Sequence, residues 1–153
     1  MQGRRWLVDC GADYCMTPHR NQLMQMEASP LTHVMAAGGE QLPVLGQGRC
    51  VILLGDGKYL ELPRVQLVPG LPCPLLSVSR LNDLGLAPHL TTERHYMGDA
   101  KGKVVLATEQ KTGALNEGVL YYLPYPTLAD PEVSDHTLPK GTEAGTHGEY
   151  WYT

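Results

Sequence analysis

The sequence contains no phenylalanine and few charged side chains, since only 18% of its residues are Asp, Glu, Lys or Arg. The formal net charge is −4, and no segment gathers Lys and Arg into a basic stripe. Proteins that bind phosphate backbones neutralise them with clustered Lys and Arg. We therefore expect no direct nucleic-acid partner.

Long apolar runs are also missing. The longest strongly apolar stretch, CVILL at 50–54, is far too short to cross a bilayer, and the opening MQGRRWLVDC lacks the apolar region of a signal peptide. We expect a cytoplasmic protein with no membrane partner.

The spacings of the four cysteines contain no metal-binding motif. Cys10, Cys15, Cys50 and Cys73 form no CxxC pair, and the six histidines complete no zinc spacing with them. We expect no metal and no cofactor, with reduced cysteines packed as small apolar side chains. A Cys/His metal protein stays open as the weakest alternative.

Turn-forming residues and short apolar runs are what the sequence does have. The 153 residues include 17 Gly and 12 Pro, and 42% are hydrophobic, which is enough to bury the core of one domain. Many short Val/Leu runs favour strands over long helices. The sequence predicts a mostly β domain over residues 1–124. A flexible acidic tail is expected at 125–153, where few large apolar side chains are available for burial.

Turn signals divide the domain into short elements. Asp56-Gly57 predicts the turn of a hairpin, in which Pro63 marks an edge or bulge. Ser77 and Gly85 are typical of the start and stop of one short helix. The other expected elements are a strand at 5–8, one or two helical turns at 18–24, a β-ribbon at 31–45, and strands at about 88–97, 103–108 and 118–123.

The stretch RRWLVDCGADYCMT contains a candidate active-site carboxylate, Asp9. An apolar run ends at Asp9, and Cys10, Gly11 and Ala12 follow at once. Gly11 allows close backbone approach and Ala12 leaves the turn uncrowded, so a carboxylate fits into a closed site. The plainer reading is an Asp that caps an ordinary turn, because a six-residue pattern is weak on its own.

Three segments in order make the pattern specific. They are DCGADYCMT (9–17), VMAAGGEQLPVLGQG (34–48) and PGLPCPLLSVSRLNDLG (69–85), and GVLYYL (118–123) follows them. Together they resemble the retropepsin-like aspartic protease of copia-type LTR retrotransposons, a region of the Gag-Pol polyprotein. The family's pattern has an Asp-Ser/Thr-Gly-Ala turn, a flap hairpin, and a PGL…LLSV segment before GLYYL.

The resemblance implies a single-lobed, closed β-barrel fold that is active as a homodimer. Each chain supplies one catalytic residue, here Asp9, and the sequence has no second apolar run leading into such a turn. Two facing carboxylates share one proton, and the unprotonated one activates a water against a peptide bond. Aspartic proteases are a standard illustration of this coupling. The implied substrate is the chain's own polyprotein, cut in the cytoplasm or inside virus-like particles.

The resemblance also assigns the residues around Asp9. Met35, Ala36, Ala37, Gly38 and Gly39 would form the flap over a bound peptide, although an ordinary surface hairpin has the same signals. Three further residues, Leu75, Leu76 and Ser77, would support the catalytic turn and also serve as plain core.

Cys10 departs from the family pattern, which has Ser or Thr bracing the two catalytic turns across the dimer axis. A thiol is a weak hydrogen-bond donor. Three hypotheses for Cys10 stay open. The family's dimer tolerates the thiol with weaker bracing, or the chain is a domesticated copy that binds peptides without cutting them. In the third, a Cys10–Cys10 disulfide across the axis gives redox control. Cys15 stands where the family has His. The leading prediction is an aspartic endopeptidase, and the alternative is a catalytically inactive dimerisation or peptide-binding module.

Overall fold

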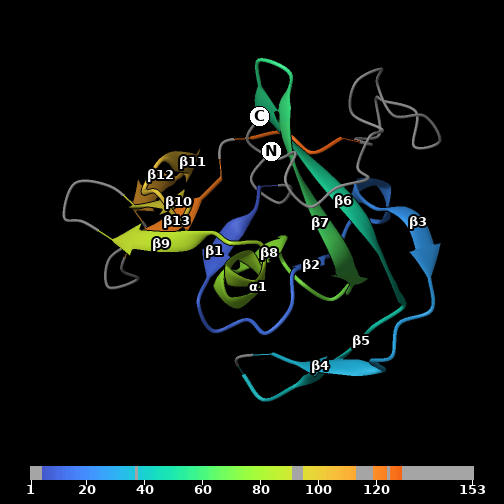
Figure 1. Ribbon diagram of the computed structural model, residues 1–153. Helices are drawn as coiled ribbons and strands as arrows, with labels where there is room; N and C mark the ends of the chain where they lie inside the picture. The colour runs from blue at the N-terminus through green and yellow to red at the C-terminus, as the bar shows by residue number, and fades with distance from the viewer. Residues whose placement is uncertain (1–4, 37, 91–94, 113–118, 124, 129–153) are drawn as a thin grey trace.

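The computed structural model shows a mostly β chain with one short α-helix, as the sequence predicts (Figure 1). It describes residues 5–36, 38–90, 95–112, 119–123 and 125–128. The elements are β1 (Leu7–Asp9), β2 (Met16–Thr17), the 3-10 helix η2 (Arg20–Gln22), β3 (Met24–Glu27), β4 (His33–Met35), β5 (Gln41–Pro43), β6 (Gly46–Gly55), β7 (Lys58–Leu67), β8 (Leu75–Ser77), α1 (Val78–Asp83), β9 (Ala87–Leu90), β10 (His95–Gly98), β11 (Val104–Ala107), β12 (Glu109–Thr112) and β13 (Val119–Tyr122).

Eight strands form the main sheet, in the order β12-β13-β1-β8-β2-β7-β6-β3. Its two outermost strands, β12 and β3, are not hydrogen-bonded to each other, so the sheet is open in the part of the chain that the structure describes. The expectation of a closed barrel is therefore wrong for these residues. One physical reason lies at the edge strand β3, which has only four residues, pairs irregularly with β6 and has a positive φ of 54° at Gln25. A short and irregular edge strand offers few regularly placed backbone groups to a further strand.

The longest strands, β6 and β7, form an antiparallel hairpin that crosses the molecule (Figure 1). Asp56 and Gly57 have φ angles of 54° and 75°, as a two-residue turn of the primed type requires, so the predicted turn is confirmed. Pro63 and Arg64 together face the single residue Arg49, which is the bulge that the proline predicted. The bulge bends the hairpin close to its far end.

The core forms around Trp6, whose side chain is 0% exposed. Ile52, Leu60, Leu106 and Leu123 pack into the same cluster, so segments from both halves of the chain meet there. The indole Nε1–H donates a hydrogen bond to Thr127 Oγ1 at 3.0 Å. The start of the chain is thereby joined to the last residues that the structure describes.

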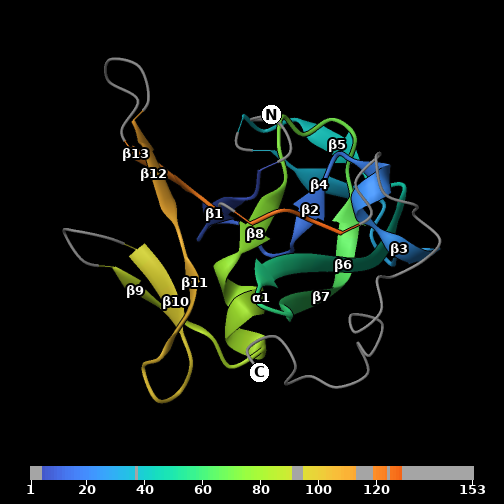
Figure 2. The same cartoon turned by 90° about the horizontal axis from the view of Figure 1, so that it is seen from above.

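A smaller three-stranded sheet, β11-β10-β9, lies beside the end of the main sheet that β12 and β13 form (Figure 2). The predicted domain boundary fell after residue 124. Leu128 is 3% exposed, and its N–H donates to Val51 O at 2.8 Å, so the packed structure reaches this residue. The remainder of the expected tail, 129–153, lies outside the described residues.

The segment predicted as helical at 18–24 is only partly so. One 3-10 turn, η2, is followed at once by the strand β3, which pairs with β6. Thr17 Oγ1 accepts a hydrogen bond from His19 N–H at 3.1 Å and donates one to the buried Gln22 side chain. These side-chain bonds hold a single turn, and sheet pairing then decides the conformation of the next residues.

Candidate functional site

Asp9 ends β1 in the middle of the main sheet. The strand lies between β13 and the parallel strand β8, where Asp9 is paired with Ser77. The Asp9 Oδ1 atom accepts a hydrogen bond from Gly11 N–H at 2.8 Å, and the side chain is half-buried. The turn thus orients the carboxylate while leaving part of it accessible.

Gly11 permits this turn through its lack of a side chain. A Cβ at this position would lie 3.3 Å from Asp9 Oδ1, tighter than most real contacts. Ala12 is buried directly behind it. The Asp-X-Gly-Ala pattern therefore has a steric reason at Gly11, whereas Ala12 places a small apolar side chain in a buried position.

Ser77 holds the loop that follows Asp9. Its buried Oγ donates to Ala12 O at 2.6 Å, and its N–H donates to Cys15 Sγ at 3.4 Å. The same Oγ accepts from Arg80 N–H at 3.3 Å and so caps α1, as the sequence predicted. One serine thereby connects the helix to both ends of the segment 12–15.

The two leucines before Ser77 lie in the sheet beside β1. Leu75 is paired with Leu7 and Leu76 with Val8, and Leu76 is 0% exposed. The side chain of Leu75 is half-buried. These positions provide apolar packing next to the strand that carries Asp9.

Arg80 is a second brace that sequence reasoning missed. Its Nε–H donates to Asp13 O at 2.9 Å, and its guanidinium lies 4.8 Å from the centroid of the Tyr14 ring. It also forms an ion pair with Asp83 at 3.3 Å. The i,i+3 Arg/Asp spacing was visible in the sequence, but the carbonyl at Asp13 is brought close only by the fold.

Two thiols lie near the carboxylate. Cys10 is exposed, whereas Cys73 is half-buried. Burial raises the pKa of the Cys73 thiol, and the negative charge of Asp9 raises it further. Sequence reasoning did not single out Cys73 for the site, because 64 residues separate it from Asp9 along the chain.

The hairpin β4–β5 covers the loop after Asp9. Val34 and Leu42 pack in one cluster with Ala12, Met16 and Val68. A Cβ at Gly70 would lie 3.0 Å from Leu42 Cδ2, so the segment before β8 approaches the hairpin closely as well. The structure thus brings the predicted ribbon onto the predicted turn.

The tip of this hairpin projects away from that cluster. Met35 is 65% exposed, Gly38 and Gly39 are exposed, and Ala36 is half-buried. Ala36 N–H donates to Glu40 O at 2.8 Å, which closes the tip. Ala37 lies outside the described residues. The predicted flap residues that the structure describes therefore lie outside the apolar cluster of Ala12, Met16 and Val68.

Residues 6–86 match the family model described as Pol polyprotein, beta-barrel domain. This is just over half of the 153 residues. The chain belongs to this family. It derives from the Pol polyprotein of a retrotransposon or retrovirus. No curated protein and no solved structure matches the chain.

The family match contains every predicted site residue, from Asp9 to Ser77, as well as α1. Strands β9 to β13 lie beyond it, although β13 pairs with β1. The matched region thus contains the candidate site residues, and the packed structure of this chain extends beyond it.

Within the described ranges, no three His, Cys, Asp or Glu side chains are grouped so as to hold a metal ion. None of the helices in that part of the chain is long and apolar enough to span a bilayer.

Proposed function

We propose that this Pol domain is an aspartic endopeptidase of the retropepsin type, from a copia-like element, with Asp9 as its catalytic residue. The observation that carries the proposal is the position of Asp9 at the end of a central strand. Its carboxylate is oriented by Gly11 N–H, and the following loop is braced by Ser77 and Arg80. A catalytic carboxylate needs this kind of fixed but accessible placement.

One Asp per chain requires two chains for an acid–base pair. In a C2 homodimer the same turn of each copy faces the axis, so the two Asp9 carboxylates lie side by side. Such a pair holds one proton, because two adjacent negative charges repel each other. The unprotonated carboxylate takes a proton from the attacking water. The protonated one donates to the carbonyl oxygen and later serves the leaving amine.

The hairpin β4–β5 supplies the cover for a bound peptide. Its inner side chains, Val34 and Leu42, already rest on the loop after Asp9, and its tip remains free for contact with a substrate. A polypeptide bound as an extended strand below the tip would be shielded from water. The proposed substrate is the polyprotein itself, cut in the cytoplasm or inside virus-like particles, with no cofactor.

The test is cleavage of a peptide library taken from the polyprotein, measured by mass spectrometry at mildly acidic pH with reductant. We expect the wild-type chain to cut and Asp9→Asn to be inactive, because the amide cannot accept the water's proton. The Asp9→Asn variant should keep its fold and its dimer, as measured by circular dichroism and analytical ultracentrifugation.

Asp13→Asn is the matched control. Asp13 is exposed in the same loop, and it meets Arg80 through its backbone carbonyl rather than its side chain. This variant should cut like the wild type. Equal cleavage by wild type and Asp9→Asn would refute the proposed pair.

Cys10 favours a second candidate, a catalytically inactive module that binds peptides or dimerises. Its exposed thiol stands where the resembled family has a hydroxyl that braces the dimer, and a thiol donates only weakly. A dimer that binds library peptides but cuts none of them would support this candidate. Restored cleavage in Cys10→Thr would then identify the thiol as the cause.

A further inference from the structure

A pocket of about 250 Å³ lies behind the loop that follows Asp9, and Asp9 does not line it. Its walls come from the loop itself, from α1, from the bulge of β7 and from the segment before β4. The lining side chains are mainly apolar or arginine, and they include Tyr14, Leu31, Leu62, Arg64, Arg80 and Leu84. The proposed peptide chemistry makes no use of this pocket.

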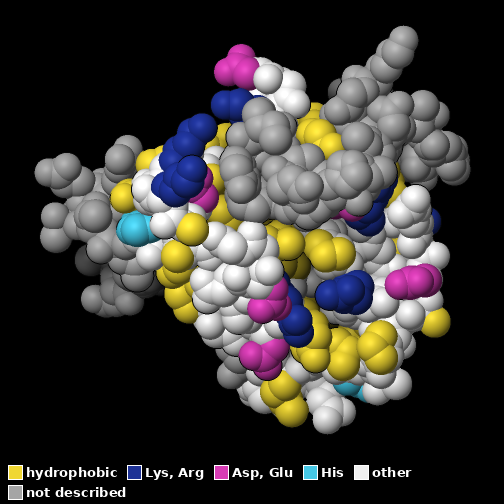
Figure 3. Space-filling model, viewed as in Figure 1, with side chains coloured by type: hydrophobic (Ala, Val, Ile, Leu, Met, Phe, Trp, Pro, Cys, Tyr) yellow, Lys and Arg dark blue, Asp and Glu magenta, His cyan; other side chains and the backbone are white. Residues whose placement is uncertain are grey.

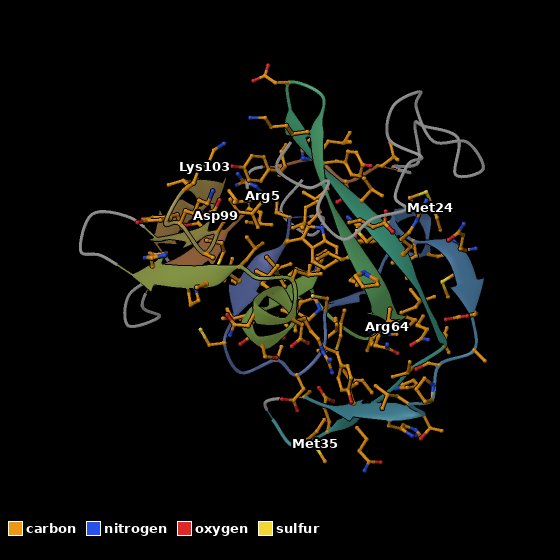
Figure 4. All side chains as sticks on the ribbon, in the orientation of Figure 1. Arg5, Met24, Met35, Arg64, Asp99 and Lys103 are labelled. Carbon is orange, nitrogen blue, oxygen red and sulfur yellow. The ribbon has the colours of Figure 1, made fainter. Side chains whose placement is uncertain are left out.

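The bulge in β7 places Arg64 at the pocket. Arg64 has a φ of 53°, a left-handed conformation that a non-glycine residue adopts at an energetic cost. Within the described residues, the Arg64 guanidinium makes no ion pair. In the view of Figure 4, Arg64 lies between the end of β7 and the β4–β5 hairpin. The bulge therefore presents an unpaired cation beside an apolar wall.

The lining carries net positive charge on a chain that is negative overall. It contains the guanidinium groups of Arg64 and Arg80 and only one carboxylate, that of Asp83. Figure 3 shows Lys and Arg side chains next to apolar ones on this face, above the β4–β5 hairpin. An occupant that combines a carboxylate with aromatic rings would complement this surface.

We propose that residues 149–152 of this same chain, Glu-Tyr-Trp-Tyr, occupy the pocket. These residues lie outside the described part of the chain, and their sequence places one carboxylate directly before three aromatic rings. The Glu149 carboxylate pairs with Arg64, and an aromatic ring enters between Leu31, Leu62 and Leu84. Trp and Tyr are the side chains that most often anchor such contacts.

The length of the chain allows this contact. Leu128, the last described residue, is hydrogen-bonded to Val51 on β6. Gln47 lines the pocket and lies four residues before Val51 on the same strand, so the two residues are about 13 Å apart. The 21 residues from Leu128 to Glu149 span about 70 Å when extended. A loop of this length closes at modest entropic cost, and tethering supplies a local concentration on the order of millimolar.

The experiment uses Trp151 as a reporter in the full chain. The sequence has two tryptophans, and Trp6 is fully buried, so acrylamide quenching reports mainly on Trp151. We expect a quenching constant several-fold lower than that of the free peptide 145–153. Arg64→Glu should raise it towards the peptide value, and so should Glu149→Lys. The double variant should restore protection, because it re-forms the pair with reversed charges.

Lys58→Glu is the matched control. It makes the same change of charge on the same hairpin, but Lys58 does not line this pocket, so protection of Trp151 should persist. Urea unfolding followed through Trp6 checks that each variant is folded. Quenching of the wild-type chain equal to that of the free peptide would overturn the proposal. Protection that disappears on dilution would also overturn it, because a second copy would then be the occupant.

Discussion

Cys15 shows how burial changes the chemistry of a single side chain. It lies in the loop after Asp9 and accepts the N–H of Ser77. Burial raises the pKa of the Cys15 thiol to about 11, and the Ser77 hydrogen bond and the charge of Arg80 offset only part of that effect. The neutral thiol is therefore the form that the folded state accepts.

This pKa shift makes stability depend on pH in the alkaline range. The unfolded chain loses the Cys15 proton at a lower pH than the folded chain does. The contribution of the buried Cys15 thiol to the free energy of unfolding is thus fully present below about pH 9, and it is lost as the pH rises through about 11. We expect the free energy of unfolding of wild type to fall by about 3 kcal/mol more than that of Cys15→Ala over this window. Urea denaturation at several pH values measures the difference, and parallel curves for the two proteins would contradict it.

At the scale of elements, the β4–β5 hairpin is attached to the loop after Asp9 by apolar contacts on one of its faces. Leu42 belongs to the cluster with Ala12 and Met16, whereas its neighbour Gln41 is exposed. Alternation along a strand places these two side chains on opposite faces. The two positions therefore form a matched pair for substitution.

Leu42→Asn should release the hairpin from the loop. Removing a half-buried leucine and inserting an amide is expected to lower the free energy of unfolding by about 1–3 kcal/mol. The rate of cleavage after Glu40 by a glutamate-specific protease should rise, since local opening exposes the backbone. Gln41→Asn should leave both quantities close to wild type. Equal cleavage rates for the two variants would show that Leu42 does not hold the hairpin.

Local signals predicted several elements well. The Asp56-Gly57 turn, the Ser77 cap and the stop at Gly85 (φ 84°) are all present, because each depends on backbone preferences within a few residues. The short strands β2, β3, β8 and β12 were missed, and the single strand expected at about 88–97 is two antiparallel strands, β9 and β10. Two to four residues carry no readable period, and the missed strands exist because neighbouring strands offer them hydrogen bonds.

At the scale of the whole molecule, residues 119–128 complete the packing of the N-terminal strand. Leu123 N–H donates to Trp6 O at 2.9 Å, and Thr127 accepts the indole N–H of Trp6. Leu123 and Leu128 are both buried. The family match ends at residue 86, yet the described core depends on a segment more than thirty residues later.

Two truncated chains test how much residues 119–128 contribute to stability. A chain ending at residue 128 keeps the contacts of Leu123, Thr127 and Leu128 and should unfold cooperatively. A chain ending at 118 loses two buried leucines and leaves the Trp6 indole N–H without its partner. The expected loss is about 5 kcal/mol or more, comparable with the total stability of many domains. Urea unfolding of both truncated chains measures this, and equal stability would show that 119–128 is dispensable.

The sequence by itself determined the β character, the main hairpin turn, the short helix and the Asp-X-Gly-Ala turn, because these follow from local sterics and short-range periodicity. Only the tertiary structure decided through which atoms Ser77 holds that loop, that Arg80 braces it as well, that Cys73 lies within the field of Asp9, and that the main sheet is open among the described residues. Those features depend on which distant segments pack together. Contacts between residues some sixty positions apart leave no trace in the local pattern of either segment.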